Sequence, residues 1–203
     1  MDEPVAGTAK PKNAVVVLLD SLNRHMLGAY GGREFETPNL DRFAARATRF
    51  TNHFTGSLPC MPARHDILCG ALDFLWRPWG SVEIWEDAIT FELRKKGVVT
   101  QLISDHPHLF ETGGENYHVD FTAWDYQRGH EGDPWKTRAD PSWAGAPNFM
   151  RGHMPYDDSR GHFRGEADFP GPRTMGAAAR WIADNAGHHD RFMLFIDEFD
   201  PHE

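Results

Sequence analysis

Short apolar runs alternate along the chain with segments whose apolar residues recur at helical spacing. Residues Ala14 to Leu19 form a continuous apolar run rich in β-branched side chains, and further strands are expected over 98–104 and 192–196. An uninterrupted run such as 14–19 is typical of a strand that is buried on both faces of a parallel sheet. The pattern therefore predicts three strands.

Segments with helical signals separate these runs. A helix is expected from Pro38, with Thr37 as its N-cap and Phe43 on its apolar face. A second helix ends at Gly97, and a third covers 172–187. Strands that alternate with helices predict an α/β fold with a mainly parallel sheet sandwiched by helices.

Between Tyr126 and Gly171 the periodicity gives way to Gly, Pro, Trp and His. Such a stretch is either a system of functional loops or disordered. Its many aromatic residues argue against full disorder. We therefore expect residues 1–203 to form one domain, or part of a larger one, with a loop-rich insertion over 126–171 close to a substrate pocket.

Composition excludes several classes of protein. The chain of 203 residues is 40% hydrophobic, which allows a sizeable core, and it carries a net charge of −9 with no run of basic residues. A nucleic-acid partner is therefore not expected. No apolar run is long enough to span a membrane, and residues 1–13 lack the pattern of a secretion signal. With two cysteines, the sequence predicts a soluble protein of a reducing compartment, the cytoplasm.

The two cysteines are not expected to pair or to bind zinc together. If the segment after Pro62 is helical, Cys60 and Cys69 lie about 13 Å apart. A disulfide needs Cα atoms within about 7 Å. The same distance disfavours a zinc site built from Cys60, His65 and Cys69, because no second pair of ligands completes it.

The ends of the three predicted strands are polar. They carry Asp20 and Ser21 after the first strand, Asp105, His106 and His108 after the second, and Asp197, Asp200 and His202 after the third. In parallel α/β sheets, ligands bind outside the carboxyl ends of the strands. The pattern favours a site for a hard cation or for acid–base chemistry. The alternative is that these acids only terminate strands and cap the helices that follow.

The segment GSLPCMPARHDILCG, residues 56–70, adds a candidate nucleophile. Pro62 suits the first turn of a helix, so Cys60 is expected at a helix N-terminus with Arg64 one turn further on. Free amides, the helix dipole and the guanidinium favour an anion there, and they predict an acidified, reactive thiol. The alternative is a buried structural cysteine at a helix start.

The segment CMPAR, residues 60–64, resembles the Cys-x-Pro-x-Arg signature of the type I sulfatases in the alkaline phosphatase superfamily. Residues 13–32, 37–54 and 199–203 resemble other N-terminal landmarks of that family, in the expected order. The resemblance implies an alkaline phosphatase-like fold of which this chain holds the N-terminal portion. Its partner would then be the C-terminal half of the same fold.

The resemblance also implies a mechanism. Cys60 would be converted to formylglycine by a formylglycine-generating enzyme, and one hydroxyl of the hydrated aldehyde would attack the sulfur or phosphorus of an ester. The other hydroxyl would then expel the anion. Arg64 would hold the hydrate, and His202 would act as the general acid. Asp20 would bind a divalent metal together with residue 60, which polarises the ester.

Other positions match the family less closely. His106 is a further catalytic candidate, whereas Asp105 and His108 are candidates for substrate binding. Ser21 stands where many sulfatases have a second Asp, and it is at most a weak metal ligand. Calcium is the expected cation, with manganese favoured if His or amide groups take part.

Three functions follow from these observations. The first is hydrolysis of a small-molecule sulfate monoester, with a homo-oligomer left open. The closest alternative is a phosphonate monoester hydrolase or phosphodiesterase with the same apparatus. An alternative of another class is a non-catalytic fragment or binding module.

Overall fold

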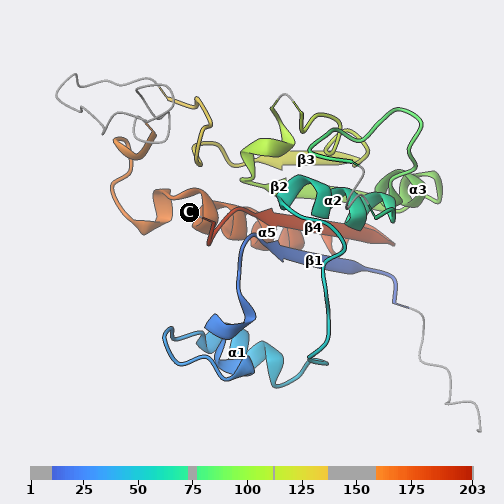
Figure 1. Ribbon diagram of the computed structural model, residues 1–203. Helices are drawn as coiled ribbons and strands as arrows, with labels where there is room; N and C mark the ends of the chain where they lie inside the picture. Colours follow the sequence, from blue (N-terminus) through green and yellow to red (C-terminus); the bar gives the residue numbers. More distant parts are fainter. Residues whose placement is uncertain (1–10, 73–76, 112, 137–158, 203) are drawn as a thin grey trace, which may run out of the picture.

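The strands of the computed structural model form a single parallel sheet (Figure 1). The structure describes residues 11–72, 77–111, 113–136 and 159–202. Strands β1 (Ala14–Leu19), β2 (Val99–Ser104), β3 (Ala123–Tyr126) and β4 (Phe192–Glu198) lie in the order β1-β4-β2-β3. Each neighbouring pair is parallel. The three predicted strands are β1, β2 and β4, and the predicted α/β fold is confirmed.

The register of the sheet brings the ends of three strands together. Strand β4 lies between β1 and β2, and its residue Asp197 pairs with Leu18 on one side and Ser104 on the other. Backbone hydrogen bonds continue past the strands, since the Asp20 amide donates to the Glu198 carbonyl at 2.9 Å. The polar residues that follow β1, β2 and β4 therefore share one edge of the sheet.

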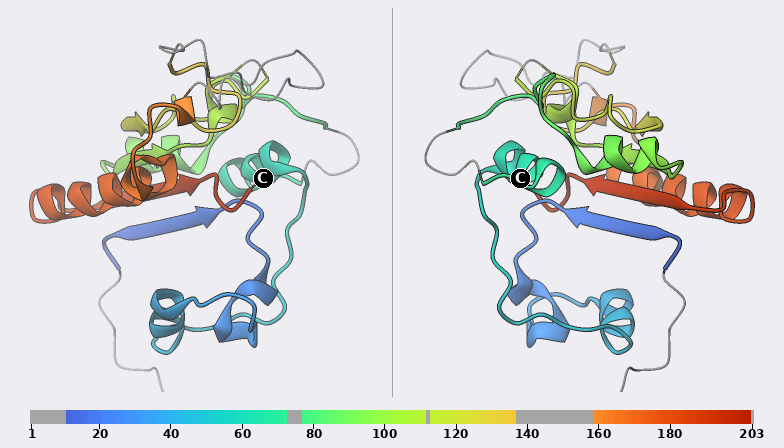
Figure 2. Two further views of the ribbon diagram at one scale, coloured as in Figure 1. Left: turned by 90° about the vertical axis from the view of Figure 1, so that its left-hand side faces the viewer. Right: turned by 90° about the vertical axis from the view of Figure 1, so that its right-hand side faces the viewer.

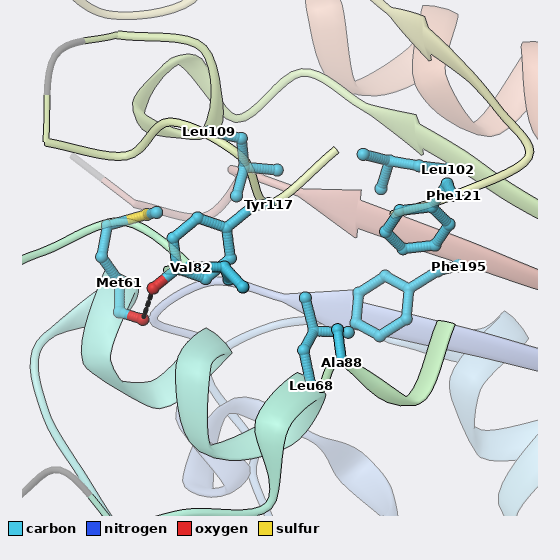
Figure 3. Packing of buried hydrophobic residues seen from close by; sticks show 9 residues of the cluster. All are labelled: Met61, Leu68, Val82, Ala88, Leu102, Leu109, Tyr117, Phe121 and Phe195. Atoms are coloured by element: carbon cyan, nitrogen blue, oxygen red, sulfur yellow. Dashed lines mark hydrogen bonds between the residues drawn. The ribbon is translucent and has the colours of Figure 1, made fainter. Parts of the chain in front are cut away.

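Helices cover both faces of the sheet (Figures 1 and 2). Helices α2 (Cys60–Cys69) and α3 (Ile89–Lys95) lie on one side, and α5 (Pro170–Asn185) lies on the other. The core on the α2 side contains Met61, Leu68, Val82, Ala88, Leu102, Leu109, Tyr117, Phe121 and Phe195 (Figure 3). The core on the α5 side contains Ile103, Ala177, Ala178, Phe192, Leu194 and Ile196. Successive residues of β2 and β4 thus point to opposite cores, as the pleat requires.

Strand β1 differs from its prediction. It lies at an edge of the sheet, and its residues Val15 and Val17 are 48% and 51% exposed, because none of the described segments covers them. The expected burial on both faces is therefore wrong for β1, whereas β2 and β4 are buried.

The first helix also differs from its prediction. Helix α1 (Pro38–Ala44) begins at the expected residue, but it packs mainly against the short helix η2 (Gly28–Tyr30) and stands away from the sheet (Figure 2). Phe43, expected on a buried face, is 63% exposed. Thr37 does not cap the helix with its side chain, because its hydroxyl accepts the Gly28 N–H at 3.0 Å.

Among the described residues there are also the short 3-10 helices η1 (Arg24–Met26), η3 (Pro107–Leu109) and η4 (Glu166–Asp168). In the predicted loop-rich stretch, 137–158 lie outside the described residues, and the described part holds η4 and the start of α5. Within the described part of the chain, no helix combines the length and apolar character needed to cross a bilayer.

Candidate active site

Arg64 is the centre of the site at the polar edge of the sheet. It lies one turn into α2 and is 3% exposed. Its Nε and Nη2 atoms donate to the two carboxylate oxygens of Asp197 at 2.8 and 2.6 Å, in a bidentate pair. Its Nη1 atom lies 2.9 Å from Asp20 Oδ2 and donates to the Cys60 carbonyl at 3.1 Å. The guanidinium therefore ties the start of α2 to the ends of β1 and β4.

Asp20 is held as an anion. The Ser21 hydroxyl donates to Asp20 Oδ1 at 2.9 Å, and His106 Nε2 lies 3.2 Å from Asp20 Oδ2. Burial alone would raise the pKa of Asp20, but the hydrogen bond with His106 and the charge of Arg64 outweigh it and hold the pKa well below its usual range. Ser21 thus lies beside this carboxylate, in contact with its other oxygen.

Three side chains at this edge can share a cation. Asp20, Cys60 and His106 each offer one ligand atom, and these atoms all lie within 4.8 Å of one another. The set combines an ionised carboxylate, an imidazole nitrogen and the side chain at position 60. Such a mixed set fits a divalent transition metal, whereas a harder cation would find only the one carboxylate oxygen that Asp20 offers.

Cys60 begins α2, as the sequence predicts, but its thiol is not acidified. Burial raises the pKa of Cys60 to about 11 and outweighs the opposing charge of Arg64, and the nearby Asp20 carboxylate raises it further. The predicted reactive thiol is therefore wrong for the unmodified side chain, which is protonated at neutral pH. Neither Cys60 nor Cys69 is in a disulfide, as expected.

Asp105 and His106 are both fully buried at the end of β2. Asp105 Oδ1 accepts the Phe199 N–H at 2.7 Å, and burial raises the pKa of Asp105 to about 6. The ring of His106 packs edge-on against Phe199, with centroids 4.8 Å apart. Burial lowers the pKa of His106, which favours the neutral imidazole. Asp105 therefore anchors the backbone after β4, while His106 faces Asp20.

His108 and His202 lie around the same phenylalanine. The centroid of the buried Phe199 ring is 5.9 Å from that of His108 and 4.5 Å from that of His202. His108 Nε2 is 3.1 Å from Glu131 Oε2, and its Nδ1 contacts Glu111. Burial lowers the pKa of His108, but these two carboxylates outweigh it and raise the pKa overall. The Phe199 ring thus packs against histidines that follow two different strands, His108 after β2 and His202 after β4.

The sequence gives less weight to two residues that matter here. Asp197, the bidentate partner of Arg64, stands out in the sequence only as one of the acids at the end of the third strand. His130, to which the sequence assigns no role, is 6% exposed, and its Nε2 lies 3.2 Å from Asp200 Oδ1. The position of Asp197 at a strand end was the available signal, whereas nothing in the local sequence marks His130.

These features define a class of protein: a parallel α/β fold with an ionised carboxylate and a helix-start cysteine near the carboxyl ends of its strands. The family profile described as Sulfatase matches residues 12–143. The chain belongs to the sulfatase family, as its Cys-x-Pro-x-Arg segment indicated.

Curated relatives agree with this family. The chain is 30% identical over 129 residues to arylsulfatase G of Mus musculus, a match that covers 60% of this chain and 24% of the relative. It is 40% identical over 67 residues to N-acetylgalactosamine-6-sulfatase of Rattus norvegicus, which covers 33% of this chain and 13% of the relative. The matched part therefore spans a quarter or less of these relatives.

Solved structures share the fold. One is the phosphonate monoester hydrolase of Agrobacterium radiobacter, with a TM-score of 0.63, 17% identity, and coverage of 95% of this chain and 42% of that one. Another is a protein solved with its substrate D-glucosamine-2-N,6-O-disulfate, with a TM-score of 0.63, 18% identity, and coverage of 96% and 35%. At these identities the likeness establishes the fold alone.

Proposed function

We propose that this chain contains the nucleophile of an enzyme that hydrolyses sulfate monoesters. The observation that supports this most strongly is the convergence of Asp20, Cys60, Arg64 and His106 at one edge of the sheet. The sulfatase relatives favour sulfate as the group that is transferred.

Two groups complete the chemistry that we propose. Conversion of Cys60 to formylglycine, together with a divalent cation, would supply a hydrated aldehyde as nucleophile and would polarise the ester oxygens. The protonated thiol of the unmodified Cys60 is a poor nucleophile, which agrees with a role as precursor. Asp20, residue 60 and His106 would hold the cation, and Ser21 would orient Asp20. The nitrogen of His106 favours manganese over the expected calcium.

The remaining residues bind and orient. Arg64 keeps its charge because Asp197 and Asp20 flank it, so it can neutralise the anionic ester while it holds residue 60 in place. We assign His202 the proton that the leaving alcohol oxygen takes up. Asp105 positions the segment from 199 to 202 through the Phe199 amide, and His108 lies at the rim of the site for substrate contact.

We further propose that the C-terminal half of the same fold completes the site. The chain spans about a quarter of arylsulfatase G and less than half of the phosphonate monoester hydrolase. The exposed face of β1, with Val15 and Val17, offers an apolar surface of the kind that another part of a sheet fold covers. The division into one domain over 1–203, the cytoplasmic location and the oligomeric state stay predictions.

A phosphorus ester is the second candidate substrate, because the phosphonate monoester hydrolase superposes on 95% of this chain. The test compares kcat/KM for p-nitrophenyl sulfate, p-nitrophenyl phenylphosphonate and bis-p-nitrophenyl phosphate. These esters share one leaving group, so differences report on the transferred group. The protein is produced in its full-length context together with a formylglycine-generating enzyme.

We expect the sulfate ester to have the highest kcat/KM, and we expect Cys60→Ala to abolish all three activities. A clear preference for either phosphorus ester would replace the sulfatase assignment with the phosphoesterase. If the Cys60→Ala variant and the converted enzyme were equally inactive towards all three, the non-catalytic module would be favoured.

A further inference from the structure

We propose that His65, Cys69 and Glu86 form a second metal site, distinct from the candidate active site, that binds a zinc-type divalent cation. One ligand atom from each residue lies within 4.8 Å of the other two. His65 and Cys69 are four residues apart on α2 and therefore share a face of the helix. Glu86 comes from the segment that precedes α3. The site thus lies towards the C-terminal end of the helix that begins at Cys60.

The surroundings of these three side chains restrict their motion. His65 is 1% exposed, and its Nε2 atom lies 3.0 Å from Glu86 Oε2. Cys69 packs against the core cluster that contains Leu68 and Ala88, two of the residues drawn in Figure 3. Ligands that are fixed by packing lose little conformational entropy when a metal binds.

The donor set suits a borderline-soft ion. Nitrogen, sulfur and a carboxylate oxygen are the ligands that zinc prefers, and three protein ligands leave a fourth tetrahedral position for water. The Cys69 thiol releases its proton to solvent when the metal binds. The thiolate and the Glu86 carboxylate then balance the two positive charges, which a partly apolar site requires.

The guanidinium of Arg77 already contacts two of the three proposed ligands, His65 and Glu86. Arg77 Nη1 lies 3.1 Å from His65 Nε2, and the same guanidinium forms an ion pair with Glu86. Arg77 Nη2 also donates to the Ser81 carbonyl at 2.8 Å and lies 3.9 Å from Glu83. A metal must therefore compete with Arg77 for Glu86, and Ser81 and Glu83 give the displaced guanidinium other partners.

The sequence disfavours zinc binding by Cys60, His65 and Cys69, because the two cysteines are far apart and no second pair of ligands completes the site. In the structure, Cys60 and Cys69 lie at opposite ends of α2. Glu86, which no local pattern connects to α2, takes the place of Cys60. The site does not depend on the proposed sulfatase activity, since it shares no residue with the Asp20, Cys60 and His106 group.

The test is a titration of the full chain with Co2+, a spectroscopic substitute for zinc, in a Cys60→Ala background. The chain has two cysteines, so a sulfur-to-cobalt charge-transfer band in the near ultraviolet can then arise from Cys69 alone. We expect the band to saturate at a single equivalent, to disappear when Cys69→Ser is added, and to be displaced by Zn2+. Far-ultraviolet circular dichroism checks that each variant is folded, and Cys60→Ser replaces Cys60→Ala if the latter is not.

Matched variants separate ligation from packing. Glu86→Gln keeps the shape of the side chain, and it should weaken binding by at least the roughly 10- to 100-fold that loss of an outer-shell partner causes. Asp87→Asn, at the neighbouring exposed acid, should leave the affinity unchanged. Arg77→Gln should strengthen binding, because it removes the competing cation. Absence of the band in the folded Cys60→Ala chain, or a band that Glu86→Gln leaves unchanged, would overturn the proposal.

Discussion

The Arg64–Asp197 pair provides the sharpest stability prediction. Asp197→Asn preserves the shape of the side chain but removes its charge and turns an amide group towards the guanidinium. Arg64 is then a buried cation whose two hydrogen bonds of 2.8 and 2.6 Å to a carboxylate are lost or weakened. Its remaining charged partner is Asp20, which also contacts His106.

The loss of unfolding free energy in Asp197→Asn follows from the burial of Arg64. Removal of one partner from a buried ion pair costs about 3–5 kcal/mol, because the other charge stays uncompensated in a medium of low polarity. One feature places this variant at the lower end, about 3 kcal/mol. Asp20 still neutralises part of the Arg64 charge.

The assay is urea unfolding followed by circular dichroism, with the free energy of unfolding taken at equal m-value. Asp190→Asn is the matched control, since it breaks the ion pair of Lys12 and Asp190 at 3.0 Å, in which both side chains are exposed. Solvent screens that pair, so the control should leave the stability nearly unchanged. If Asp197→Asn were no more destabilising than Asp190→Asn, the central role given to the buried pair would be refuted.

Two further predictions concern burial. Burial, with repulsion from Asp105, raises the pKa of Glu198 from 4.5 to about 8, so between these values the folded chain holds a proton that the unfolded chain has released. The free energy of unfolding of the metal-free chain should therefore fall as pH rises through this window. In urea unfolding, the Glu198→Gln variant should show a weaker decline with pH. A stability that rises with pH in this window would contradict the reasoning. Tyr117→Phe removes a hydroxyl whose single proton is shared between the Met61 carbonyl at 3.2 Å (Figure 3) and the Gly80 carbonyl at 3.0 Å, and it should cost about 1 kcal/mol in the same assay. An unchanged urea midpoint for that variant would show that this shared hydrogen bond adds nothing.

The strands that the sequence predicts are those with a strong local signal. Strand β1 is a β-branched apolar run, β2 and β4 are rich in apolar residues, and the bounds of all three agree with the prediction to within two residues. The sequence does not predict strand β3, because its four residues, AWDY, mix polar and apolar types and lie mostly exposed. The exposure of β1 could not be predicted either, because burial of an edge strand depends on what packs beside it.

For the candidate site, too, the sequence predicts the features that have a local signal and misses those that depend on tertiary packing. Parallel topology predicts that Asp20 and His106 approach each other, since both follow strands whose carboxyl ends share an edge. The bidentate pair of Arg64 and Asp197 depends on side-chain geometry across 133 positions of sequence, which no local spacing encodes. The thiol of Cys60 was predicted from its neighbours in sequence, but its pKa is decided by burial, which opposes the effect of Arg64.

The central claim is that Cys60 is the precursor of the nucleophile, and mass spectrometry of the peptide that contains it tests this most directly. The protein is co-expressed with a formylglycine-generating enzyme whose activity is verified on a second sulfatase in the same cells. The account predicts a residue at position 60 with oxygen in place of sulfur and two fewer hydrogens. An unmodified thiol in this protein, beside full conversion of the control, would contradict it.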